Sequence, residues 1–86
     1  MVQCSIKAVE FSRSAADFVA SLPRALKKTI GQAIRELALN PFLGIQLKGR
    51  LYGLRKRRVG DYRILYHFTE TTLKVVDVGD RKDIYR

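Results

Sequence analysis

The first third of the chain changes from a strand-like to a helix-like spacing of apolar side chains. Residues 3–10 alternate loosely between two faces, which predicts a first strand. Ser12 and Ser14 follow as candidate N-caps, because a serine hydroxyl can accept a hydrogen bond from the free amides of a helix's first turn. A short helix is therefore expected to run to about residue 21 and to bury Phe18.

A second, longer helix is predicted from the residues that follow Pro23. Proline suits the start of a helix because its missing N–H would have no partner there. Polar and charged residues fill most of the outer positions, and apolar side chains recur at helical spacing at Leu26, Ile30, Ala33, Ile34 and Leu37. Asn40 and Pro41 end this helix. The short connection between the two helices favours an antiparallel hairpin or a kinked pair.

The second half of the chain indicates a loop and then three strands. Residues 41–53 contain three glycines and predict a loop. Strand-like runs follow at residues 54–59, 62–69 and 72–78. Because about two residues connect each run to the next, neighbouring strands are expected to be antiparallel. The order β-α-α-β-β-β predicts a single α+β domain over residues 1–86, with the helical pair packed on one face of a mainly antiparallel sheet.

Basic residues dominate the first of these three strands, and the period of two decides which of them share a face. Lys56 and Arg58 share one face, while Arg55 and Arg57 share the other. On the next strand, Arg63 alternates with apolar residues and is expected to point away from the helices. Lys56, Arg58 and Arg63 are thus predicted to converge on an exposed face, with the register across the hairpin left open. For Arg55 and Arg57, two arrangements remain open. Either the aliphatic parts of their side chains follow the helix edge, or their strand lies at the margin of the sheet.

The charge of the chain turns this sheet into a candidate site. The 86 residues contain 17 Lys and Arg against 8 Asp and Glu, a formal net charge of +9. Residues 48–63 hold seven basic residues and one acid, which is a net charge of +6. Such a surplus favours a polyanionic partner, above all nucleic acid, over a solvated basic surface without a specific ligand. An apolar content of 47% excludes a disordered basic tail.

Cysteine usage and hydropathy favour a cytoplasmic protein. A single cysteine, Cys4, cannot form an internal disulfide, and small secreted domains usually carry several. The sequence shows neither a signal-peptide pattern nor an apolar run of membrane-spanning length, so no membrane partner is expected. It has no carboxylate cluster with ligand spacing, and Cys4 lies far from the single histidine, His67. We therefore expect neither a metal site nor a small-molecule cofactor.

Two segments of the chain resemble a known family. The run GLRKRRVGDYRILY at residues 53–66 and the ending VGDRKDIYR at residues 78–86 are similar to the RelE/ParE toxin superfamily of type II toxin–antitoxin systems. The arginine after the VGDY turn and the terminal pair Arg81 and Tyr85 resemble the RelE-like branch of mRNA interferases. That branch cleaves mRNA in the ribosomal A site, whereas ParE-like relatives inhibit DNA gyrase and usually lack this catalytic set.

The resemblance implies roles for individual residues of this chain. The family's catalytic arginines correspond to Arg63 and Arg81, and its C-terminal tyrosine corresponds to Tyr85. Basic positions of the second strand correspond to Lys56 and Arg58. The remaining predicted RNA contacts come from the basic cluster itself, at Lys48, Arg55 and Arg58. The chain departs from relatives at two positions. Leu54 stands where a basic residue would be expected, and Asp80 stands where many relatives carry a histidine.

These residues suit RNA cleavage by the RNA's own 2′-hydroxyl, which needs no metal. Guanidinium groups at Arg63 and Arg81 would bind phosphate oxygens and offset charge in the transition state. Lys56, crowded by like charges, is the expected base, and Tyr85 would stack on a nucleobase or donate a proton. The expected protein is a ribosome-dependent endoribonuclease toxin whose partners are a cognate antitoxin and the ribosome with its mRNA. A ParE-like gyrase inhibitor and a catalytically degenerate nucleic-acid-binding module remain as alternatives.

Overall fold

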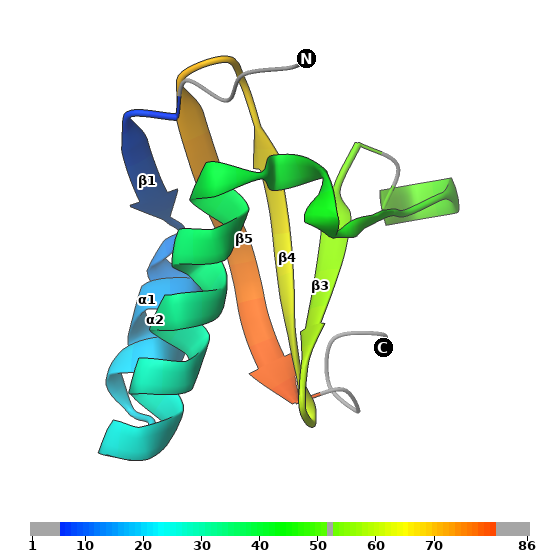
Figure 1. The fold of residues 1–86 in the computed structure, drawn as a ribbon. Coiled ribbons are helices and arrows are strands. Elements are labelled where there is room, and N and C mark those ends of the chain that lie inside the picture. The colour runs from blue at the N-terminus through cyan, green and yellow to red at the C-terminus, as the bar shows by residue number, and fades with distance from the viewer. Residues whose placement is uncertain (1–5, 52, 81–86) are drawn as a thin grey trace.

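The computed structural model describes residues 6–51 and 53–80 of the chain (Figure 1). The elements follow the order β1 (Ala8–Phe11), α1 (Arg13–Ala20), α2 (Arg24–Leu39), the 3₁₀ helix η1 (Pro41–Leu43), β2 (Ile45–Gln46), the 3₁₀ helix η2 (Gly49–Leu51), β3 (Arg55–Val59), β4 (Tyr62–Phe68) and β5 (Thr72–Asp80). Among the described residues, no helix is both long and apolar enough to span a membrane.

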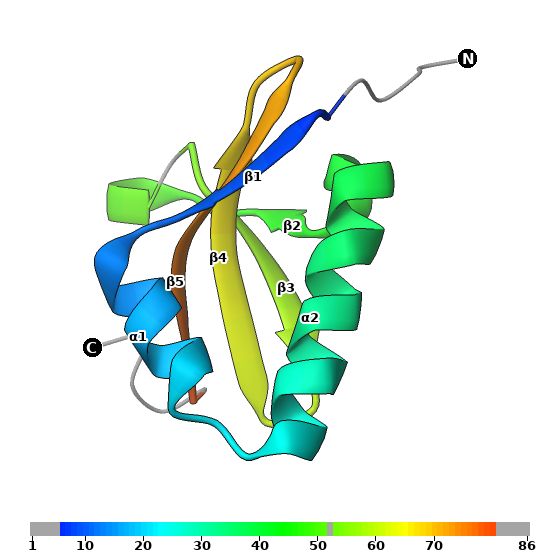
Figure 2. The ribbon, with the colours of Figure 1, turned by 90° about the vertical axis from the view of Figure 1, so that its left-hand side faces the viewer.

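The strands form one five-stranded sheet in the order β1-β5-β4-β3-β2. β1 runs parallel to β5, and the other neighbouring pairs are antiparallel. Both α-helices lie on the same side of the sheet (Figures 1 and 2). The core between the two layers contains Ala15, Ile30, Ala33, Ile34, Leu37, Ile64, Tyr66, Leu73, Val75 and Val78. The α+β architecture predicted from the sequence is confirmed.

Local sequence explains where the helices begin and end. Ser12 is the N-cap of α1, and its hydroxyl accepts a hydrogen bond from the Ala15 amide at 3.1 Å. On α2, buried residues recur at the spacing of one helical face, which packs against β4 and β5. Asn40 follows the last turn of α2, and its side-chain oxygen accepts from the Phe42 amide at 3.2 Å to start η1. Capping residues thus define both ends of the helical layer.

The structure differs from the predicted elements mainly between residues 41 and 53. The sequence predicts a loop there, but the structure forms η1, β2 and η2. A strand of only two residues has no periodicity of its own, because its existence depends on pairing with β3. β5 also continues to Asp80, beyond the predicted end at residue 78. Of the predicted first strand, residues 3–5 lie outside the described residues, and the strand that forms is Ala8–Phe11.

Candidate nucleic-acid interface

The β3–β4 hairpin brings three predicted site residues onto one face of the sheet. Arg58 lies directly opposite Arg63, and Lys56 lies directly opposite Leu65. Residues that face each other across an antiparallel pair share a face, and the intervening Ile64 packs in the helix-side core. Lys56, Arg58 and Arg63 therefore lie on the face opposite α1 and α2, as the alternation predicts. We call these three residues the basic face.

The basic face brings like charges close together across the hairpin. Like charges directly opposite each other on neighbouring strands destabilise a sheet, and here two guanidinium-bearing residues, Arg58 and Arg63, are paired. Arg58 is exposed, while Lys56 and Arg63 are half-buried. Half-burial holds these two side chains near the sheet and limits how far their charges can separate. A bound polyanion would relieve this repulsion.

β5 contributes the residues that border the basic face. Gly79 lies opposite Arg63, so the position of β5 directly across from that arginine carries no side chain. Asp77 lies opposite Leu65 and adds an acidic group to this face. Farther along the same strands, His67 is paired with Lys74, which adds another cation. The border is thus mixed in charge, and the positive charge is concentrated at the end of the hairpin that carries Arg58 and Arg63.

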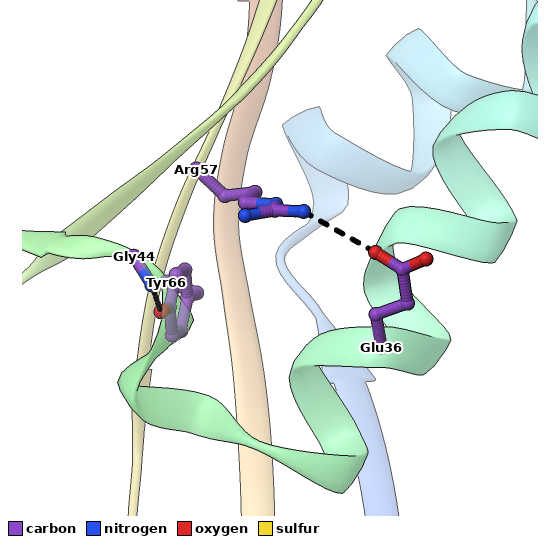
Figure 3. Close-up of polar contacts among 4 residues, drawn as sticks. All are labelled: Glu36, Gly44, Arg57 and Tyr66. Carbon is purple, nitrogen blue, oxygen red and sulfur yellow. Dashed lines mark hydrogen bonds and ion pairs between the residues drawn. The ribbon is translucent and has the colours of Figure 1, made fainter.

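Arg55 and Arg57 lie on the opposite, helix-facing side, and Arg57 reaches the helical layer. Arg57 Nη2 lies 3.2 Å from Glu36 Oε1 of α2 and forms an ion pair (Figure 3). Arg55 lies where β3 is flanked by the short strand β2 near the sheet margin, and its Nη2 donates to the Gly44 carbonyl at 2.9 Å. Its guanidinium carbon lies 5.5 Å from the centre of the Phe42 ring. The structure therefore separates Arg55 from the basic face, although the sequence predicts it as an RNA contact.

Tyr66 and Gly44 form a buried junction that sequence reasoning missed. The Tyr66 hydroxyl donates to the Pro41 carbonyl at 2.7 Å. It accepts from the Gly44 amide at 2.9 Å (Figure 3). Burial raises the pKa of the Tyr66 phenol above its ordinary value of 10.0, and the Gly44 hydrogen bond and the charge of Arg55 offset only part of that effect. The phenol therefore stays protonated at neutral pH and keeps donating to Pro41. The sequence contained no signal for the partners of Tyr66.

The other predicted site residues are placed as follows. Lys48 is exposed between β2 and η2. Leu54, which stands where the resemblance predicts a basic residue, is half-buried just before β3. Asp80 is the last residue of β5. Arg81 and Tyr85 lie outside the described residues. Within residues 6–51 and 53–80, no group of three or more His, Cys, Asp or Glu side chains is placed to hold a metal ion.

Comparison with known proteins gives a consistent result over nearly the whole chain. Residues 9–85 match the model of a family described as the ParE toxin of the type II toxin–antitoxin system parDE. A search of curated protein sequences found no significant match.

Solved structures with the same fold include several toxins. The toxin–antitoxin complex RelBE2 from Mycobacterium tuberculosis contains a chain 31% identical to this one, with a TM-score of 0.75 and coverage of 96% of this chain and 97% of that chain. The YoeB/ParE toxin from Agrobacterium tumefaciens is 22% identical, with a TM-score of 0.76 and coverage of 87% and 99%. The archaeal RelE–RelB complex from Pyrococcus horikoshii is 21% identical, with a TM-score of 0.72 and coverage of 92% and 98%. At these last two identities the likeness concerns the fold.

Proposed function

Because this chain belongs to the RelE/ParE toxin superfamily of type II toxin–antitoxin systems, we propose that it is a ribosome-dependent endoribonuclease that cleaves mRNA in the ribosomal A site. The observation that carries this proposal is the basic face. Arg58 and Arg63 are paired directly across the hairpin, with Lys56 two residues along β3. Basic side chains brought together on one face of a sheet are suited to bind closely spaced phosphates.

The proposed reaction uses the RNA's own 2′-hydroxyl as nucleophile. The 2′-oxygen loses its proton to a base and bonds to the adjacent phosphorus, and the bond from phosphorus to the 5′-oxygen breaks. The leaving 5′-oxygen takes up a proton, which leaves a 2′,3′-cyclic phosphate and a 5′-hydroxyl. Arg63 and Arg81 stabilise the charge on the phosphorane oxygens, Lys56 accepts the first proton, and Tyr85 stacks on a nucleobase and orients it.

Contacts to neighbouring phosphates complete the proposed site. Arg58 is exposed beside Arg63 and binds the RNA backbone, and Lys48 extends the positive surface beyond β2. Arg55 contributes to this site indirectly, by holding the Gly44 carbonyl at the sheet margin. Since Asp80 replaces a histidine of many relatives, the ribosome is proposed to supply part of the acid–base chemistry and the positioning of the mRNA.

The proposed partners follow from this activity. RelBE2 and the Pyrococcus horikoshii RelE–RelB pair are toxin–antitoxin complexes, and we propose that a cognate antitoxin likewise binds and neutralises this chain. The second partner is the ribosome with its mRNA, which places the activity in the cytoplasm.

A second candidate function is DNA gyrase inhibition. The family model that matches residues 9–85 is that of the ParE toxin, and this observation favours a toxin that acts by binding a protein. Such a toxin would leave mRNA intact and stop DNA synthesis. A catalytically degenerate nucleic-acid-binding module would leave mRNA intact and would not stop DNA synthesis.

One experiment separates these functions. The chain is expressed under an inducible promoter while mRNA 5′ ends and DNA synthesis are both followed. We expect new 5′ ends within codons and continued DNA synthesis. Arg63→Ala should reduce cleavage at least about 100-fold, because a lost transition-state contact costs about 10²–10³ in rate. Arg24→Ala, which removes an exposed arginine of α2, is the matched control and should cleave normally.

Three results would contradict the proposal. Intact mRNA with arrested DNA synthesis would favour the gyrase inhibitor. Wild-type cleavage by a folded Arg63→Ala variant would exclude the proposed site, and thermal unfolding of that variant shows whether it folds. Rapid cleavage of naked RNA by the purified chain would exclude the dependence on the ribosome.

A further inference from the structure

Asp77 is an acidic residue on the same face of the sheet as the three cations of the basic face. It lies directly opposite Leu65 on β4, and Leu65 lies directly opposite Lys56 on β3. The three residues therefore form one row across the sheet, on the side away from the helices. An acid at this place weakens the attraction of the basic face for phosphate. The position of Asp77 therefore indicates a second kind of contact.

An irregularity in β5 turns Asp77 toward this face. Leu73 and Val75 face the helices and belong to the core, so unbroken alternation would point Asp77 toward the helices as well. Between Val75 and Asp77 the pairing with β4 shifts, which leaves Val76 without a paired residue. Asp77 then faces away from the helices, and Val78 returns to the core. Bulges of this kind re-aim side chains beside functional sites.

Contacts from the helical layer hold this irregularity in place. The Ser12 hydroxyl donates to the Val76 carbonyl, and the Ser12 amide donates to the Val75 carbonyl at 2.9 Å. Ser12 is also the N-cap of α1, which ties the bulge to the start of that helix. The fold thus fixes the direction of Asp77 before any ligand binds. A group that is oriented in advance loses less entropy on binding.

The carboxylate of Asp77 is available to a ligand. Asp77 is half-buried, and within residues 6–51 and 53–80 its side chain has neither a hydrogen bond nor an ion pair. It therefore does not serve to neutralise Lys56 in its own row or Lys74 on its own strand. A carboxylate accepts hydrogen bonds and donates none, so it binds N–H groups rather than phosphate oxygens.

The nucleobases are the parts of RNA that carry N–H donors. Guanine places two of them, N1–H and the 2-amino group, side by side on its Watson–Crick edge, so one carboxylate can accept both. Adenine and cytosine place an acceptor nitrogen beside the amino group, and that nitrogen repels a carboxylate. Uracil has one N–H between two carbonyls. Because single-stranded RNA exposes these edges, guanine is the base that fits Asp77 best.

The spacing of the site puts this base next to the phosphate bound by Arg63. Gly79 lies opposite Arg63 and two residues from Asp77, a separation of about 7 Å along β5. That separation matches one nucleotide of an extended strand. His67 is exposed on the same face, two residues beyond Leu65 on β4, where its ring can stack on a base. RNA held by Arg63 thus brings an adjacent base to Asp77.

We infer that Asp77 is a specificity residue that selects guanine in the nucleotide next to the phosphate bound by Arg63. The inference rests on the proposed cleavage of mRNA and adds the base that the site selects. Asp77 takes no part in bond breaking. It accepts two hydrogen bonds from guanine and so favours cleavage beside this base.

The first test replaces the carboxylate by an amide of the same shape. Asp77→Asn offers one acceptor and one donor, a pattern that matches adenine or cytosine rather than guanine. Asp17→Asn is the matched control, because it makes the same chemical change at an exposed position of α1. Each chain is expressed in cells, and mRNA 5′ ends are mapped by sequencing and corrected for the base composition of the transcripts. Thermal unfolding verifies the fold of each variant.

We expect the wild type and Asp17→Asn to cut beside guanine at least about tenfold more often than beside adenine, as a bidentate base contact allows. In Asp77→Asn this preference should disappear or reverse in favour of adenine. Such a change of base is a result that a purely structural role of Asp77 would not produce.

The second test measures the base contact without cleavage. The probes are 2′-deoxy oligothymidines that carry one central guanine or one central hypoxanthine, which lacks the 2-amino group. In fluorescence anisotropy the wild type should bind the guanine probe at least about tenfold more tightly, because hypoxanthine loses one hydrogen bond to a charged group. Asp77→Asn should bind the two probes equally.

Several outcomes would overturn the inference. Cleavage without a base preference by the wild type, or equal binding of the two probes, would exclude the reading of guanine. A guanine preference that persists in a folded Asp77→Asn variant would assign the selection to another residue. An equal rise in cleavage beside every base would leave Asp77 as a modulator of charge alone. Failure of the proposed function is distinguishable, because intact mRNA with tighter binding of the guanine probe removes the cleavage and keeps the base contact.

Discussion

At the scale of single residues, Gly44 is required by contact rather than by backbone conformation. Its φ of −79° and ψ of 167° are open to any residue. A Cβ at this position would overlap the Tyr66 hydroxyl and come within 2.7 Å of the Lys56 carbonyl oxygen. Neither neighbour can retreat, because Tyr66 is fully buried and the Lys56 carbonyl belongs to β3. The absence of a side chain at Gly44 therefore allows the segment between η1 and β2 to lie close to Tyr66 and to β3.

Gly44→Ala is expected to destabilise the protein by about 1–3 kcal/mol, the usual cost of overpacking. Gly31→Ala is the matched control, because a Cβ there would meet nothing within 4 Å and Gly31 lies inside α2. This control should stabilise the protein by about 0.5–1 kcal/mol through helix propensity. Urea unfolding of both variants measures the difference. Equal stabilities of the two would contradict the close approach at Gly44.

At the scale of elements, one hydroxyl both starts α1 and joins it to the sheet. Ser12 Oγ accepts from the Ala15 amide at 3.1 Å and donates to the Val76 carbonyl of β5. The Ser12 amide also donates to the Val75 carbonyl at 2.9 Å. Val76 lies where β5 is irregular opposite Leu65 and Tyr66, so its carbonyl gains a partner that regular pairing does not provide.

Ser12→Ala should cost about 2 kcal/mol, since it removes an N-cap and leaves the half-buried Val76 carbonyl without its hydroxyl partner. For a domain of this size the midpoint of thermal unfolding would fall by roughly 8–16 °C. Ser14→Ala tests the other candidate cap of the sequence and should change stability by less than about 0.5 kcal/mol. A larger effect at Ser14 than at Ser12 in thermal unfolding would assign the cap to Ser14.

At the scale of the whole molecule, the net charge of +9 is distributed over two faces with different roles. On the helix-facing side, Arg55 and Arg57 are engaged with Gly44 and Glu36. On the other side, Arg58 and Arg63 face each other across the hairpin. The Arg57–Glu36 pair is partly solvent-accessible, so it contributes little to stability and serves mainly to orient the arginine. We propose the basic face as the principal site for a polyanion.

The affinity of the protein for single-stranded RNA should therefore fall as the salt concentration rises, as expected for a few phosphate contacts. With three such contacts, log K is expected to fall with log salt at a slope of about −2. Arg58→Ala should reduce that slope by about 0.7, whereas Lys28→Ala, which changes an exposed lysine of α2, should leave it unchanged. Fluorescence anisotropy with a non-cleavable 2′-deoxy oligonucleotide measures the slope. An Arg58→Ala slope equal to that of the wild type would remove Arg58 from the interface.

The sequence by itself determined the elements whose signals are local. Capping serines, the helical spacing of Ile30, Ala33 and Leu37, and the two-residue hairpin connections predict the helices, the three long strands and the α+β class, because each depends on neighbours along the chain. Alternation with a period of two also assigned Lys56 and Arg63 to one face before their register was known.

Only the tertiary structure decided the features that depend on residues far apart in the chain. The partners of Tyr66 lie 22 and 25 positions away, and the partner of Arg57 lies 21 positions away. The Tyr66 hydroxyl joins the backbone of Pro41 and Gly44 to the sheet, and no local pattern of the sequence predicts that contact. Alternation assigns a side chain to a face, but packing selects its partner among the many residues on that face. The basic face could thus be predicted from the sequence, whereas the junction of Tyr66 with Pro41 and Gly44 could not.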